Sequence, residues 1–132
     1  MGTFQEMKSL AGLVFVMDDD DAVRNLVVLM LKRFGLEVES FACGEDLLVR
    51  YNAGMPLPDL MLLDIQVGAG MGGEECLQKL HDLGSRIPAI AMTGMAGQGG
   101  SCPEACGFSG YLGKPFTITD LHAVVDRQFN RE

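Results

Sequence analysis

Basic residues are scarce in this chain of 132 residues. Ten Lys and Arg stand against 18 Asp and Glu, which gives a formal net charge of −8 at pH 7. A protein that binds nucleic acid non-specifically needs a positive surface to neutralise the backbone phosphates. The charge therefore argues against direct binding to nucleic acid.

A long apolar segment is also missing. No stretch approaches the roughly 20 apolar residues of a membrane-spanning helix, and the first apolar run, residues 10–17, is interrupted by Gly12. We expect no membrane partner. The N-terminus lacks a secretory pattern, and Glu6 stands where a myristoylation motif requires Ser or Thr. The four cysteines then indicate a reduced, cytoplasmic protein, and Cys102 and Cys106 lack the further cysteines or histidines of a zinc site.

The apolar content is nevertheless sufficient for one full core. Hydrophobic residues make up 48% of the sequence, and a domain of this size buries about 68% of the surface that its unfolded chain exposes. We expect a single domain over residues 1–132. Continuous apolar runs predict buried strands, and apolar residues at helical spacing predict helices between them. The expected strands lie at 13–17, 36–41, 60–63, 87–92 and 110–112, and the expected helices at 22–34, 45–51, 74–82 and 118–129.

Strand and helix alternate along the chain, so the predicted fold class is α/β with a parallel sheet. One segment departs from this pattern, because five glycines and Pro103 lie between Thr93 and Gly110. A glycine costs about 1 kcal/mol in a helix relative to alanine, and a proline about 3 kcal/mol. We therefore expect no regular helix in residues 94–109, and at most a turn or two near residues 103–106.

Charged and polar residues follow the expected strands at corresponding ends. Asp18 and Asp19 follow the first strand, Asp64 the third, Thr93 the fourth and Lys114 the fifth. The carboxyl ends of parallel strands share one rim of a sheet, where ligands bind. Crowded carboxylates repel each other unless a cation compensates, and hard oxygen ligands open to water suit Mg²⁺. Lys114 adds an ammonium, and Thr93 a hydroxyl that can donate to a phosphoryl oxygen.

Four segments together resemble the receiver domains of two-component response regulators. They are VMDDD at 16–20 with Arg24 following, PDLMLLD at 58–64, IPAIAMT at 87–93 and GYLGKPF at 110–116. They occur in this order at the expected strand ends, and the resemblance covers essentially the whole chain. It implies a flavodoxin-like, doubly wound sheet of five parallel strands in the order 2-1-3-4-5.

The resemblance also implies a role for each residue at the rim. Asp64 would be the phosphoacceptor, a carboxylate nucleophile that takes a phosphoryl group from phosphohistidine. Asp18, Asp19, Asp64 and the backbone carbonyl of Gln66 would bind Mg²⁺, for which Mn²⁺ is an alternative. Lys114 would neutralise charge on the transferring phosphoryl group from the other side.

Further roles implied by the resemblance concern signalling. Thr93 and Tyr111 would form the switch pair, in which the hydroxyl moves toward the phosphoryl group and the ring turns into the vacated space. Lys114–Pro115 resembles the family's cis peptide. The implied partners are a sensor histidine kinase or phosphotransfer protein and a downstream effector. The chain would catalyse only its own phosphorylation and slow autodephosphorylation, with Gln66 and Gly94 bordering the path of the attacking water, so we expect no separate substrate.

Departures from the family leave an alternative open. Gly68 stands where the loop after the acceptor usually has proline, and Met71 where an acidic residue is common. The glycine-rich residues 94–109 fall where the output face is expected, which suits a phosphorylation-independent interaction module of the same fold, a pseudo-receiver. A phosphohydrolase that uses an aspartyl phosphate requires a further Asp two residues beyond the nucleophile, where this chain has Gln66.

Some residues also have purely structural interpretations. Asp20 and Asp21 suit the N-cap of the first helix, and Tyr111 suits ordinary packing in a strand. Three apolar residues lie off the main stripes of the first and last helices, and they either widen the buried face or form a surface for a partner or a homodimer: Val28, Leu29 and Val124.

Overall fold

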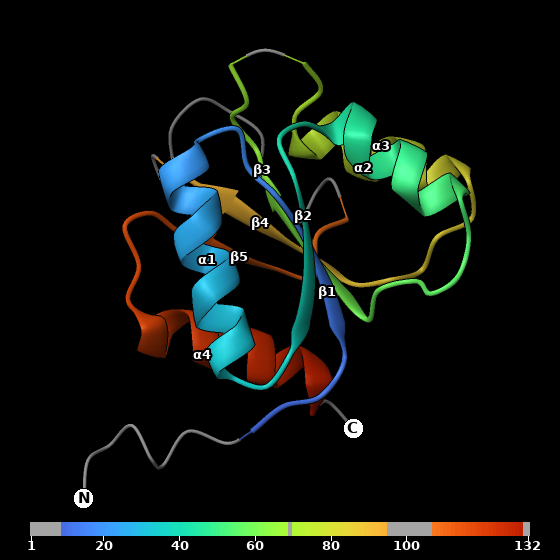
Figure 1. Cartoon of the computed structure of the whole chain (residues 1–132). Coiled ribbons are helices and arrows are strands. Elements are labelled where there is room, and N and C mark those ends of the chain that lie inside the picture. Colours follow the sequence, from blue (N-terminus) through green and yellow to red (C-terminus); the bar gives the residue numbers. More distant parts are fainter. Residues whose placement is uncertain (1–8, 69, 95–106, 131–132) are drawn as a thin grey trace, which may run out of the picture.

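The protein folds into a sheet of five parallel strands with helices on both faces (Figure 1). This computed structural model describes residues 9–68, 70–94 and 107–130. The strands are β1 (Leu13–Met17), β2 (Glu37–Phe41), β3 (Leu60–Asp64), β4 (Ala89–Thr93) and β5 (Gly110–Gly113). The helices are α1 (Asp21–Arg33), α2 (Gly44–Asn52), α3 (Gly73–Asp82) and α4 (Ile118–Phe129). The strand order is β2-β1-β3-β4-β5, which confirms the predicted topology.

Each face of the sheet has its own apolar core, because successive strand side chains point to opposite faces. In β3, Leu60 and Leu62 pack under α1 and α4, whereas Met61 and Leu63 pack under α2 and α3 (Figure 1). All residues of β3 are buried. Burial on both faces explains why this strand is a continuous apolar run rather than an alternating one.

Helix α1 begins at Asp21 because Asp20 caps it. The Asp20 Oδ1 atom accepts hydrogen bonds from the backbone N–H groups of Ala22 (2.9 Å) and Val23 (3.2 Å). The capping interpretation of Asp20 is thus confirmed, whereas Asp21 lies inside the first turn of the helix. The predicted start of β4 at residue 87 is two residues early, since the strand begins at Ala89, after Pro88, which has no N–H to donate.

Helical spacing of the apolar residues in α1 does not always lead to burial. Leu26 has helical spacing with the core residues Val27 and Leu31, yet its side chain is 50% exposed. Leu29 is also exposed, at 65%. Val124 packs against the core beneath α1 and α4, so it widens the buried face.

The expectation for the glycine-rich segment concerns residues that lie almost entirely outside the described part of the chain, and so do Cys102 and Cys106. The two cysteines that the structure does describe, Cys43 and Cys76, are free thiols. Within the described ranges, every helix is too short or too polar to cross a membrane.

Two glycines that follow helices allow a test of how closely the segment before β1 packs. Gly35 and Gly54 have similar positive φ angles, 103° and 99°. A Cβ at Gly35 would lie 2.6 Å from the carbonyl oxygen of Leu10, whereas a Cβ at Gly54 would meet no atom within 4 Å. We expect Gly54→Ala to lower the free energy of unfolding by about 1 kcal/mol, which is the backbone cost alone, and Gly35→Ala to lower it by at least about twice as much. Urea denaturation measures both, and equal losses would contradict the close contact at Leu10.

Candidate functional site

The register of the strands brings the predicted site residues to one rim of the sheet. Met17 of β1 pairs with Leu63 of β3, so Asp18 follows β1 beside the end of β3 at Asp64. On the other side of β3, Asp64 pairs with Met92. Thr93 of β4 in turn pairs with Gly113 of β5, directly before Lys114. The predicted convergence of these strand ends is therefore present in the fold.

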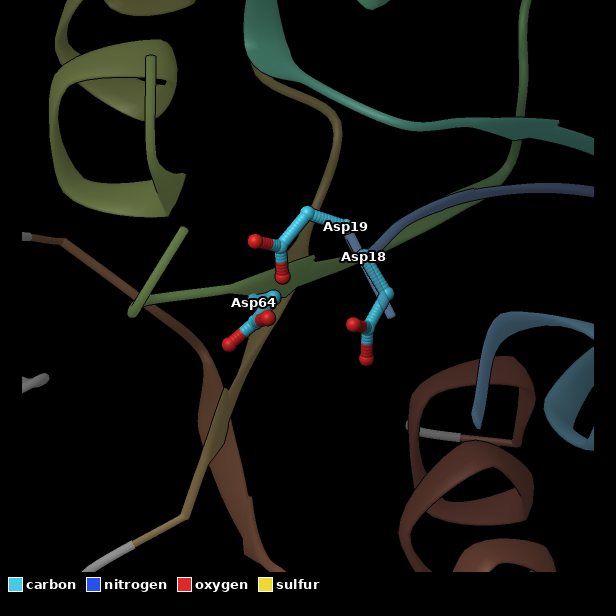
Figure 2. A group of neighbouring side chains, drawn as sticks. All are labelled: Asp18, Asp19 and Asp64. Atoms are coloured by element: carbon cyan, nitrogen blue, oxygen red, sulfur yellow. The ribbon is translucent and has the colours of Figure 1, made fainter. Parts of the chain in front are cut away.

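Three carboxylates cluster at this rim. One carboxylate oxygen each from Asp18, Asp19 and Asp64 lies within 4.8 Å of the other two. Figure 2 shows the three side chains at the ends of β1 and β3, gathered around a common space. Asp18 and Asp64 are buried, whereas Asp19 is exposed, so the cluster is open to solvent on the Asp19 side.

Asp18 is completely buried and uses both carboxylate oxygens within the protein. Its Oδ1 accepts from the backbone N–H of Asp20 at 2.9 Å, and its Oδ2 accepts from Lys114 Nζ at 2.8 Å. The Arg24 guanidinium donates to the backbone carbonyl of Asp18 at 2.8 Å and pairs with Asp21. These contacts fix the turn between β1 and α1, and with it the position of the carboxylate.

Lys114 is the compensating cation of the cluster. Its Nζ lies 2.8 Å from Asp18 Oδ2 and 3.5 Å from Asp64 Oδ2. Burial alone would lower the pKa of Lys114, but the hydrogen bond to Asp18 and the negative charges of Asp64 and Asp18 raise it above its usual value. The peptide bond Lys114–Pro115, directly after this residue, is cis, as predicted.

Asp64 is held less firmly than Asp18. Its Oδ1 accepts from the backbone N–H of Gln66 at 3.0 Å, and the ion pair of its Oδ2 with Lys114 is longer, at 3.5 Å. Burial and the charge of Asp18 raise the pKa of Asp64 to about 6, although Lys114 and the Gln66 N–H act in the opposite direction. The ionised carboxylate is therefore costly in the folded chain when no further cation is present.

The sequence did not indicate what holds Asp19. Its Oδ2 accepts from the backbone N–H of Gly68, 2.8 Å away and 49 residues later in the chain. The one available signal was that Gly68 replaces the usual proline of the resembled family. That signal marks an extra N–H in the loop, but it does not identify the acceptor.

The donor set fits a divalent cation with a preference for oxygen. Three carboxylates converge with one ammonium beside them, so the cluster carries excess negative charge. Carboxylate oxygens in a partly open site are the ligands that Mg²⁺ takes, together with water. The site is thus chemically suited to Mg²⁺ or Mn²⁺ through Asp18, Asp19 and Asp64. The Gln66 carbonyl as a fourth ligand stays a prediction.

The remaining predicted residues lie around the same rim. Thr93 ends β4 half-buried, and its backbone carbonyl accepts from the Lys114 N–H at 2.7 Å. The Gln66 Oε1 atom lies 3.5 Å from the place that a Cβ at Gly94 would take, so these two residues are neighbours. Tyr111 on β5 is 52% exposed. Its side chain therefore lies at the surface of the edge strand β5 and not in the buried core.

Comparisons with known proteins agree with this geometry. Residues 14–126 match the family model of the response regulator receiver domain. The transcriptional regulatory protein FixJ of Azorhizobium caulinodans is 32% identical over 124 residues, which cover 89% of this chain and 55% of FixJ. The DNA-binding transcriptional regulator NtrC of Klebsiella pneumoniae is 30% identical over 117 residues, which cover 88% of this chain and 24% of NtrC. The chain thus corresponds to only a part of either relative.

A solved structure shares the fold. The receiver domain of the Francisella response regulator 1452 matches with a TM-score of 0.77 at 22% identity, covering 91% of this chain and 98% of that one.

The burial of Asp64 and the nearby charge of Asp18 predict an unusual effect on stability. Because the folded state raises the pKa of Asp64, its ionised carboxylate destabilises the fold above about pH 6, and this penalty fades as the pH falls toward 4. Without divalent cations, Asp64→Asn should raise the free energy of unfolding by about 1–3 kcal/mol at pH 8 and by less at pH 5. Lys114→Met should act in the opposite direction, because it leaves two buried carboxylates uncompensated. Urea denaturation in EDTA measures the free energy of unfolding of both variants. If Asp64→Asn were less stable than the wild type at pH 8, the raised pKa of Asp64 would be contradicted.

Proposed function

The chain belongs to the response regulator receiver domain family, and on this premise we propose that it is a phosphorylation-controlled signalling switch. The observation that carries the proposal is the cluster of Asp18, Asp19 and Asp64 with Lys114 beside it. A domain that only binds a partner has no need for three converging carboxylates, two of them next to a partly buried ammonium. The cluster therefore favours phosphoryl chemistry over the pseudo-receiver alternative.

Asp64 is the proposed phosphoacceptor. One of its carboxylate oxygens attacks the phosphorus of a phosphohistidine, so that a P–O bond forms while the P–N bond breaks and its electron pair returns to the imidazole. Of the two Asp64 oxygens, Oδ2 is the better candidate, because Oδ1 already accepts the Gln66 N–H. The more ionised Asp64 is, the better it serves as a nucleophile, and Lys114 favours the ionised form.

The surrounding groups stabilise charge on the transferring phosphoryl group. A bound Mg²⁺ would supply electrostatic neutralisation of the phosphoryl oxygens. Lys114 Nζ lies 3.5 Å from Asp64 Oδ2, which places an ammonium beside the reacting oxygen. The Thr93 hydroxyl is the proposed third donor, and its position at the end of β4 lies on the same rim.

The phosphoryl group is also the proposed signal. Its oxygens draw the Thr93 hydroxyl inward, and the Tyr111 ring, which is 52% exposed, turns into the space that is vacated. The proposed phosphoryl donor is a sensor histidine kinase or a phosphotransfer protein. The proposed output is a changed surface around β5, which a downstream effector binds. Gln66 and Gly94 border the path of the water that slowly hydrolyses the aspartyl phosphate, so the chain acts on no separate substrate.

Intact mass spectrometry tests the phosphoacceptor directly. The chain is incubated with acetyl phosphate and Mg²⁺, or with EDTA in place of Mg²⁺. We expect one phosphoryl adduct that requires Mg²⁺ and is absent in Asp64→Asn, because an amide oxygen is a poor nucleophile. Asp20→Asn is the matched control. It removes a neighbouring carboxylate but keeps the helix cap, since Asn caps as well as Asp, so its adduct should equal that of the wild type.

A cognate kinase extends the test to the physiological donor. If neither acetyl phosphate nor a phosphorylated kinase labels Asp64 while Mg²⁺ still binds, the phosphorylation-independent module becomes the better description of this chain. An adduct that persists in Asp64→Asn would assign the acceptor to another residue.

A further inference from the structure

The loop after β3 reaches back to the carboxylate cluster through one backbone hydrogen bond. The N–H of Gly68 donates to Asp19 Oδ2 at 2.8 Å. Asp19 itself comes from the segment after β1, so this bond joins two loops of the rim that are distant in sequence. The bond involves one of the three carboxylates that could bind a divalent cation.

Asp19 depends on this contact more than its two neighbours depend on theirs. Asp18 is 0% exposed and Asp64 is 2% exposed, so packing restricts both side chains. Asp19 is exposed, and within the described residues the Gly68 N–H is the one donor that reaches its carboxylate. An exposed aspartate without such a partner samples several rotamers. Cation binding then restricts the side chain to one rotamer, and the lost conformational entropy weakens the binding.

The loop that carries Gly68 has a second anchor. The N–H of Met71 donates to Glu45 Oε1 at 2.8 Å, and the Met71 carbonyl accepts from the N–H of Gly44 at 2.9 Å. Both partners belong to the first turn of α2. The loop is therefore held from α2 independently of Asp19, so the Gly68 N–H acts on Asp19 from a supported position.

We infer that the backbone N–H of Gly68 is a positioning group for divalent-cation binding, because it orients the Asp19 carboxylate toward Asp18 and Asp64. A carboxylate can accept an N–H on one oxygen and bind a cation with the other. Proline, which the resembled family usually has at this place, has no N–H and could not make the bond. The inference rests on the proposed function to the extent that the cluster binds Mg²⁺.

Two substitutions at Gly68 separate the effect of its N–H on cation binding from the effect of its missing side chain. Gly68→Pro removes the donor. Gly68→Ala keeps it, and the added Cβ would lie 3.4 Å from Asp19 Oδ2, an ordinary contact. The φ angle of Gly68 is outside the left-handed region, so alanine is not strained there. Alanine is therefore the conservative variant, and the two variants differ in the hydrogen bond under test.

The Mg²⁺ dissociation constant of each variant is measured by titration monitored with amide NMR, without any phosphodonor. Loss of a contact that orients a metal ligand typically weakens metal binding about 10–100-fold. We expect Gly68→Pro to weaken Mg²⁺ binding about tenfold and Gly68→Ala to stay close to the wild type. Equal affinities in wild type and Gly68→Pro would overturn the inference, and so would equal weakening in Gly68→Pro and Gly68→Ala.

A second measurement uses the wild-type chain alone and does not depend on how well Gly68→Pro folds. In the metal-free protein, the amide of Gly68 should exchange with solvent more slowly than a free amide, because it donates to Asp19 Oδ2. Asp19→Asn should keep an oxygen acceptor but remove its charge, which shifts the Gly68 amide resonance upfield. An unprotected Gly68 amide would overturn the inference. Failure of the wild type to bind Mg²⁺ would instead contradict the proposed function.

Discussion

The ion pair between Lys114 and Asp18 is the interaction on which the site depends. It joins two residues 96 positions apart in the sequence, at the ends of β5 and β1, with an Nζ–Oδ2 distance of 2.8 Å. Asp18 is fully buried and Asp64 nearly so, and buried carboxylates side by side are strongly disfavoured unless a cation lies between them. Lys114 contacts both. The chain can therefore keep its negative rim within a folded domain even before a metal ion binds.

The sheet determines that these groups meet. Both faces of β3 are covered, so its side chains from Leu60 to Leu63 are committed to the two cores. Asp64 is the first polar residue after that run, and it lies where the strand reaches the rim. The same holds for Asp18 after β1. Apolar packing thus fixes the strand register, and the register places the charged residues next to one another without any need for direct attraction between them.

Much of this arrangement could be predicted from the sequence. Continuous apolar runs predicted β1, β3 and β4, and weaker strand signals predicted β2 and β5. The shared rim of a parallel sheet predicted that Asp18, Asp64 and Lys114 converge. These inferences depend on patterns that repeat over several residues. The exposure of Leu26 could not be predicted, because helical spacing does not say how wide a stripe the sheet covers. The boundaries of the elements differed by a residue or two for a similar reason, since caps such as Asp20 depend on local hydrogen bonds.

The contact between Gly68 and Asp19 lay beyond sequence reasoning for a different reason. A backbone N–H is present at every residue except proline, so it has no signature in composition or spacing. Only the path of the loop decides which acceptor it meets. That path depends in turn on α2, because Met71 is bound there by Glu45 and Gly44. Backbone groups thus complete a site whose side chains the sequence had already indicated.

The two buried carboxylates of the site are chemically distinct, although both are aspartates at strand ends. Asp18 uses Oδ1 for the Asp20 N–H and Oδ2 for Lys114, and both distances are below 3 Å. Asp64 uses Oδ1 for the Gln66 N–H, while its Oδ2 lies 3.5 Å from Lys114. An oxygen with few hydrogen bonds is the better nucleophile, because it loses less stabilisation when its lone pair forms the bond to phosphorus. The hydrogen bonds therefore distinguish a carboxylate that orients Lys114 from one whose Oδ2 makes only a longer ion pair among the described residues.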